Sequence, residues 1–136
     1  MPYSTEVIDG GKGILHVGRD TVSGEDLLIS ANHVLNMVKE GLSPTYALAD
    51  LSEVVELSIS AEEIMLNASI NTEISKYVPR VIVAIVAPQD HVYGIARMWE
   101  AYAEETGWAT RVFRNKSEAL EWINDTHIGE HRKNQR

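Results

Sequence analysis

Apolar positions along this chain follow two spacings, one typical of strands and one typical of helices, and the two alternate. The run RVIVAIVA, residues 80–87, is apolar on both faces and rich in β-branched residues, which predicts a central strand covered by helices on each side. Apolar residues at three- and four-residue spacing predict helices that begin after Ser23, after Ser60, near Asp90 and after Asn115. Shorter apolar runs predict strands over residues 3–9, 14–17, 46–49 and 108–113.

The glycine cluster GGKG, residues 10–13, joins the first two predicted strands. A phosphate-binding loop would lead from a strand into a helix, whereas this cluster leads into another apolar strand, ILHV. Glycine permits the positive φ angles of a tight turn, so the cluster predicts a hairpin. Right-handed crossovers between the later strands then predict an α/β fold: a mixed, mainly parallel sheet of about five strands with an N-terminal hairpin and four helices.

The length and composition are those of one globular domain, with 136 residues, of which 44% are hydrophobic and 24% charged. We expect one domain over residues 1–126 and a basic, polar, disordered tail over residues 127–136. The formal net charge of -8 would repel phosphate backbones, so nucleic acid is not an expected partner. No apolar run approaches the length of a membrane-spanning helix, and the absence of cysteine fits a reducing interior, so the expected location is the cytoplasm.

Groups that could carry catalysis or bind a metal do not form a recognisable set in the sequence. The chain has no G-x-S-x-G run to expose a serine nucleophile. Its histidines lack the spacing of metal ligands, apart from His127 and His131 near the C-terminus. The sequence therefore predicts no catalytic residue, no metal and no cofactor. An enzyme would need a cleft that gathers Asp50 with His16 or His91.

The segment after the third predicted strand holds the candidate interaction residues. Asp50 lies at the carboxyl end of a parallel strand, where open α/β sheets tend to bind ligands, although its side chain can equally bond the following amides as an Asx turn. Ser60 and Glu63 have the spacing of a capping box at a helix start. We treat Asp50, Ser52, Ser58 and Ser60 as a candidate interaction or phosphorylation loop.

The order of elements, the DLSEV run at residues 50–54 and the closing VFRNKSEALEWI run at residues 112–123 together resemble the SpoIIAA-like group of bacterial proteins, which includes STAS domains. The resemblance extends from Ile14 to Ile123. It implies the SpoIIAA-like fold and a non-enzymatic protein that acts through contact with a protein partner. In STAS anti-sigma-factor antagonists, a partner kinase phosphorylates a serine at a helix start, and the phosphate blocks docking to the partner.

At the phosphorylated position the chain departs from the STAS pattern, which reads roughly Asp-Leu-Ser-Gly-Val and then Asp-Ser-Ser-Gly-Leu. Residues 50–54 match the first run, with glutamate in place of the glycine. In the second run, Ser58 takes the place of the aspartate and Ile59 that of the phosphorylated serine. A switch of the STAS kind would therefore need Ser58 or Ser60. Phosphate is favourable at a helix N-terminus, but glutamates at 62–63 add negative charge there.

A second apolar stripe on two of the predicted helices needs a partner. Leu66, Ile70 and Ile74 recur four residues apart, displaced from the face expected to pack on the sheet, and Met98 lies on a smaller stripe of the next helix. Such a stripe packs within the domain, forms a homodimer contact or lines a ligand pocket. A regulatory protein-binding module is the leading hypothesis. The alternative is a carrier of a small apolar, lipid-like ligand, because some relatives of the resembled fold are grouped with lipid-transfer Sec14-like domains.

Overall fold

The order of the strands in the sheet repeats their order in the chain. The computed structural model describes residues 2–134, and the side chains of residues 2–126. These residues form a sheet of order β1-β2-β3-β4-β5, in which β1 runs antiparallel to β2 and the other neighbours are parallel. The strands are β1 (Tyr3–Ile8), β2 (Gly13–Ser23), β3 (Tyr46–Ser58), β4 (Ile82–Val86) and β5 (Ala109–Phe113). The predicted mixed, mainly parallel sheet is confirmed.

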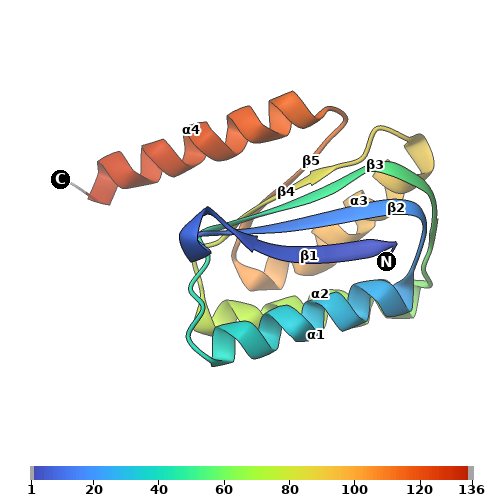
Figure 1. The fold of residues 1–136 in the computed structure, drawn as a ribbon, viewed down its shortest axis with the longest axis horizontal. Helices are drawn as coiled ribbons and strands as arrows, with labels where there is room; N and C mark the ends of the chain where they lie inside the picture. The colour runs from blue at the N-terminus through green and yellow to red at the C-terminus, as the bar shows by residue number, and fades with distance from the viewer. Residues whose placement is uncertain (1, 135–136) are drawn as a thin grey trace.

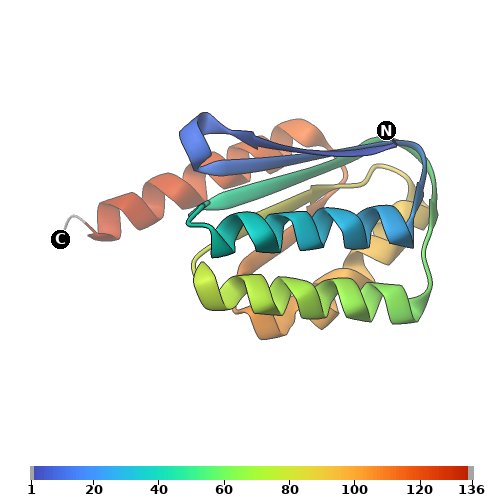
Figure 2. The ribbon, with the colours of Figure 1, turned by 60° about the horizontal axis from the view of Figure 1, so that its bottom comes forward.

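Helices cover both faces of this sheet, as Figures 1 and 2 show. Three of them pack together on one face, and α4 lies alone on the opposite face. Their bounds are α1 (Gly24–Lys39), α2 (Ala61–Tyr77), α3 (Asp90–Tyr102) and α4 (Lys116–Asn134). The predicted hairpin is present, with a short turn of 3-10 helix over Asp9–Gly11 between β1 and β2.

The starts of α1 and α2 are fixed by matching capping boxes. The Ser23 hydroxyl accepts the Asp26 amide at 3.1 Å while the Asp26 carboxylate accepts the Ser23 amide at 2.9 Å. Ser60 and Glu63 repeat this arrangement at 3.1 and 3.0 Å. Each box satisfies amides that would otherwise lack partners at a helix N-terminus, so these two predicted helix starts are confirmed.

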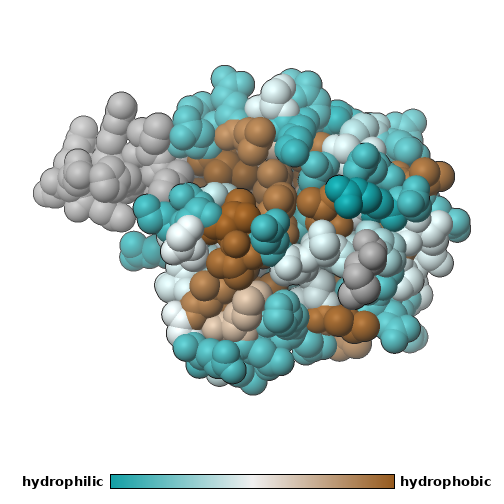
Figure 3. All heavy atoms as spheres, viewed as in Figure 1, coloured by the Kyte–Doolittle hydropathy of each residue, from teal (hydrophilic) through white to brown (hydrophobic). Residues whose placement is uncertain are grey.

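The apolar core is divided by the sheet into two clusters. The larger cluster lies between the sheet and α1, α2 and α3, and the smaller lies between the sheet and α4. Every residue of β4 is buried, as expected for a strand covered on both faces. Apolar side chains also reach the surface beside α4, where they appear brown in Figure 3, and the partly buried Leu15, Tyr46 and Trp122 pack against the smaller cluster.

Two strands are longer than the sequence predicted. The second strand was expected over 14–17 and extends to Ser23, and the third was expected over 46–49 and extends to Ser58. Register shifts between Val17 and Arg19 and between Asp20 and Thr21 let the two strands stay paired. The segment expected to be a loop after Asp50 is therefore mostly strand.

Some large apolar side chains of α3 and α4 reach the solvent. Leu120 of α4 is 47% exposed and Tyr102 of α3 is 42% exposed, whereas Ala119 and Ile123 of α4 are buried. The helix α4 continues to Asn134, into the segment expected to be a tail. The side chains beyond residue 126 lie outside those that the structure describes. No helix in the described region of the chain combines the length and apolar character needed to cross a bilayer.

Candidate functional site

A cavity of about 130 Å³ lies between the sheet and helices α1, α2 and α3. Small side chains create it. Ala47 and Ala49 of β3 line it on the sheet side, and Ala31 of α1 and Ala96 of α3 line it on the helix side. Ala47 and Ala49 keep partial exposure although helices cover both faces of β3, and the space they contact is the cavity.

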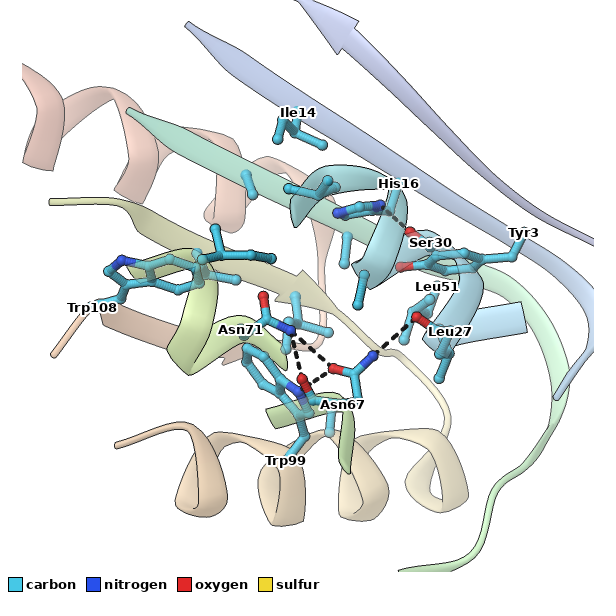
Figure 4. Close-up of a pocket in the computed structure, with 18 of the residues that line it drawn as sticks. Tyr3, Ile14, His16, Leu27, Ser30, Leu51, Asn67, Asn71, Trp99 and Trp108 are labelled. Carbon is cyan, nitrogen blue, oxygen red and sulfur yellow. Dashed lines mark hydrogen bonds between the residues drawn. The ribbon is translucent and has the colours of Figure 1, made fainter. Parts of the chain in front are cut away.

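One end of the cavity carries a polar cluster of three residues from β1, β2 and α1. Thr5 lies opposite His16 in the β1–β2 register, and its hydroxyl is 2.9 Å from His16 Nδ1. Ser30 on the covering helix is 2.6 Å from the Thr5 hydroxyl and 3.3 Å from the same ring nitrogen. The Tyr3 ring stacks on the imidazole with a centroid distance of 5.5 Å. Figure 4 shows His16 and Tyr3 lying side by side at this end.

A second polar cluster faces the first across the cavity, from α2 and α3 (Figure 4). The buried Asn67 donates to the Leu27 carbonyl at 3.0 Å, which ties α2 to α1. Its side-chain oxygen accepts Trp99 Nε1 at 2.7 Å and Asn71 Nδ2 at 3.1 Å. Trp108 closes the far side, with its indole N–H donating to the Val78 carbonyl at 2.9 Å.

Burial keeps the ionisable groups of this cavity uncharged near neutral pH. Burial lowers the pKa of His16 to about 4, because the apolar surroundings disfavour the imidazolium. The same cause raises the pKa of the Tyr3 hydroxyl above its ordinary value. None of the lining residues is Lys, Arg, Asp or Glu. The cavity is therefore an apolar chamber with neutral polar groups at two ends.

The fold around this cavity occurs in solved structures. One is an uncharacterised protein of the DUF3478 family from Shewanella loihica PV-4, described as having a SpoIIAA-like fold, with a TM-score of 0.54, 18% identity, and coverage of 88% of this chain and 90% of that one. Another is the anti-sigma factor antagonist SpoIIAA in its unphosphorylated form, with a TM-score of 0.54, 7% identity, and coverage of 92% of this chain and 97% of that one. This chain has the SpoIIAA-like fold. Neither the family models nor the curated proteins gave a match.

In this SpoIIAA-like domain the predicted loop residue Asp50 is held by three partners. The Ser52 amide and hydroxyl both donate to Asp50 Oδ1, at 3.0 and 2.5 Å, and Lys116 Nζ lies 3.1 Å from Oδ2. Partial burial acts to raise the pKa of Asp50, but the Ser52 hydrogen bonds and the Lys116 charge outweigh it and lower the pKa below its ordinary value. The carboxylate stays ionised and anchors α4 to β3.

The other two loop candidates lie apart from Asp50. Ser58 is exposed at the end of β3, and Ser60 is exposed as the N-cap of α2. Asp50 and Ser52 contact each other, but none of the four predicted loop residues lines the cavity. Of the groups that an enzyme would need, His16 lines the cavity, whereas Asp50 and the exposed His91 do not.

The four predicted interface or pocket residues are divided among different surroundings. Ile74 is 2% exposed and lines the cavity, and Ile70 is partly buried against the larger core cluster. Leu66 and Met98 are 52% and 43% exposed and point away from the core. Within the described residues, no group of three or more His, Asp or Glu is placed to hold a metal ion.

The polar groups of the cavity were missed because each sits at a position that sequence patterns assign to the core. Asn67 and Asn71 share the buried face of α2 with Ile64 and Ile74. Two signals could have found the site. Amides four residues apart on an otherwise apolar helix face require partners, and alternating small residues in the strand at 46–49 leave space.

Proposed function

We propose that this SpoIIAA-like protein is a non-enzymatic binding protein whose ligand is a small, largely apolar molecule held in the cavity between the sheet and α1, α2 and α3. The observation that carries the proposal is the cavity itself, at about 130 Å³. Well-packed interiors contain few voids larger than a water molecule. A cavity on the order of 150 Å³ with an apolar lining stays dry and binds benzene, so this one is large enough for a ligand.

The volume of the cavity limits the size of the apolar ligand that the sequence suggested. A cavity of this volume holds about six to eight non-hydrogen atoms, whereas a fatty acyl chain is larger. We therefore propose a compact molecule in place of a long-chain lipid. Catalysis is not included in the proposal, because no carboxylate is among the lining residues to orient His16 and its imidazole is a weak base.

The three tryptophans allow a direct test of ligand binding. Trp99 and Trp108 line the cavity, whereas Trp122 packs on Phe113 at the opposite face of the sheet. Titration with toluene, followed through the indole N–H resonances, should shift the Trp99 and Trp108 signals in a saturable way and leave the Trp122 signal in place. Three signals that stay unchanged, or that move together without saturation, would count against a binding cavity.

A second candidate function, contact with a protein partner, is favoured by the outer half of β3. The strand pairs with β4 only over Tyr46–Asp50, so beyond that point its second edge has no neighbouring strand among the described residues. Val55 on this outer half is 66% exposed, the highest value among the large apolar side chains described. Exposed strand edges of this kind can accept an extended segment of another chain.

The phosphorylation version of this second function is open to a separate test. In Ser60 the hydroxyl already caps α2, and a phosphate there would lie beside the Glu63 carboxylate that caps the same turn. Ser58 has no such cap and is the better acceptor of the two. Incubation with candidate serine kinases followed by mass spectrometry should modify Ser58 before Ser60. Absence of modification at both serines would remove the switch but leave plain partner binding.

A further inference from the structure

We propose that the cavity selects an uncharged alcohol or phenol, whose hydroxyl group bonds to the His16 and Tyr3 side chains. This inference rests on the proposed function, since it specifies the class of ligand at the same site. It is carried by two polar atoms that line the cavity and have no partner in the hydrogen bonds of the described residues: His16 Nε2 and Tyr3 Oη.

These two atoms are in contact with open space. Every fully shielded side-chain nitrogen or oxygen of the described residues has a hydrogen-bond partner. Atoms without a partner must therefore be accessible, and both residues line the cavity, although Tyr3 also borders a second hollow beside Thr5 and His33. In Figure 4 the ring nitrogen of His16 that is not bonded to Ser30 points inward, and the Asn71 side chain rises from α2 on the opposite side. Polar atoms left in this state favour a ligand that bonds to them.

The hydrogen bonds around His16 indicate which of its nitrogens carries the proton. Ser30 and Thr5 each have one hydroxyl hydrogen, and the three groups lie within 3.3 Å of one another. If Ser30 donates to Thr5 and Thr5 donates to Nδ1, every hydrogen of the cluster has a partner. The reverse order leaves the Ser30 hydrogen unused. The first arrangement puts the ring proton on Nε2, which then presents a donor to the cavity.

The His16 and Tyr3 end of the cavity suits a hydroxyl group. His16 Nε2–H requires an acceptor, and the Tyr3 hydroxyl can serve as donor or acceptor. A ligand hydroxyl supplies an acceptor oxygen and a donor hydrogen together. A pure hydrocarbon would leave both polar atoms without partners, which is costly in apolar surroundings.

Charged ligands are disfavoured by the same lining. A carboxylate or phosphate entering the cavity would lose its hydration and meet no Lys or Arg among the lining residues. An ammonium group would likewise meet no Asp or Glu. The ligand is thus neutral, and the volume limits it to about the size of benzyl alcohol.

The experiment compares three probes of nearly equal size: benzyl alcohol, ethylbenzene, in which a methyl group replaces the hydroxyl, and benzoate. Their dissociation constants are measured through the Trp99 indole resonance, with the wild-type protein, Tyr3→Phe and His16→Phe. Leu120→Ala, on the solvent side of α4, serves as the control variant. We expect benzyl alcohol to bind about tenfold tighter than ethylbenzene, and benzoate to bind more weakly than either.

The variants separate the polar contacts from the cavity. Tyr3→Phe keeps the ring that stacks on His16 and removes only an oxygen that bonds to no protein group. His16→Phe removes the inward donor while Thr5 and Ser30 keep each other as partners. Each should reduce the preference for benzyl alcohol over ethylbenzene several-fold and leave ethylbenzene affinity within about twofold. Should His16→Phe fail to fold, Tyr3→Phe alone decides.

The possible outcomes distinguish the two proposals. Failure of all three probes to bind would overturn the proposed function together with this inference. If ethylbenzene and benzyl alcohol bind equally and neither substitution has an effect, the proposed binding function is retained but the selection of an alcohol is refuted. Preference for benzoate would also refute it, because it would require a cation that the lining does not contain.

Discussion

Filling the cavity from the sheet side should stabilise the protein while abolishing ligand binding. Ala49→Ile adds three carbon atoms at a strand position whose side chain faces the cavity, and isoleucine also suits a strand better than alanine does. At about 0.8 kcal/mol for each buried methylene, the gain is at most about 2.4 kcal/mol. Fixing the new side chain costs about 0.5 to 1 kcal/mol, so we expect a net gain of about 1 to 2 kcal/mol.

The volume of the cavity sets an independent limit on that gain. Empty interior volume costs about 24 cal/mol for each Å³, so a cavity of about 130 Å³ corresponds to about 3 kcal/mol of lost stability. A gain of about 1 to 2 kcal/mol lies within this limit. Such a gain would mean that the wild-type protein is less stable than it could be because the cavity is kept open.

The matched control is the same substitution on the other face of the sheet. Ala84 of β4 is 0% exposed and packs in the smaller cluster beneath α4, so its side chain contacts no accessible space. Ala84→Ile should therefore overpack and lose about 1 to 3 kcal/mol. Urea unfolding of both variants, with the denaturant slope m compared with wild type, measures the difference. If Ala49→Ile loses stability as Ala84→Ile does, the cavity is not available space and the reasoning fails.

Three further predictions test other regions of the structure. Burial lowers the pKa of His16 to about 4, so on acidification the unfolded state binds a proton before the folded state does. The free energy of unfolding should therefore fall by up to about 3 kcal/mol as the pH drops from about 6.5 to about 4. Urea unfolding of His16→Phe should show a weaker pH dependence than the wild-type protein, and an equal pH dependence of the two proteins would contradict this. A Cβ at Gly24 would overlap the Glu63 carboxylate, so Gly24→Ala should displace the cap of α2 and cost about 1 kcal/mol, measured by thermal unfolding; an unchanged midpoint would refute the contact. If the exposed Leu66 and Met98 form a homodimer contact, light scattering should report a dimer that Leu66→Asp converts to a folded monomer, and a monomeric wild type ends that proposal.

The strand and helix order could be predicted from the sequence because caps and apolar periods agree at most elements. The outer halves of β2 and β3 could not. In β3 the buried residues Leu51, Val54 and Leu57 recur every third position, because β3 carries an extra residue at each of its two register shifts against β2, and these bulges break the two-residue alternation of a regular strand. Without that alternation, Asp50 and the polar residues after it are typical of a loop.

The candidate site shows a different limit. The sequence could suggest that a helix face carried more apolar residues than a sheet needs, but Leu66 and Met98 turned outward and only Ile74 of the named set lines the cavity. Which residues line it depends on how α1, α2 and α3 are tilted on the sheet. A partner pair such as His16 and Ser30, from β2 and α1, exists only once that packing is formed.

The agreement between strand order and chain order has a consequence for synthesis of the protein. Each strand pairs with the one made immediately before it, so a nascent chain can extend the sheet edge by edge without waiting for a distant segment. The residues that line the cavity are synthesised in the same order. Those of α1 and α2 come first, whereas Trp99 comes with α3 and Trp108 comes just before β5. During translation the chamber stays open on one side until these two indoles leave the ribosome.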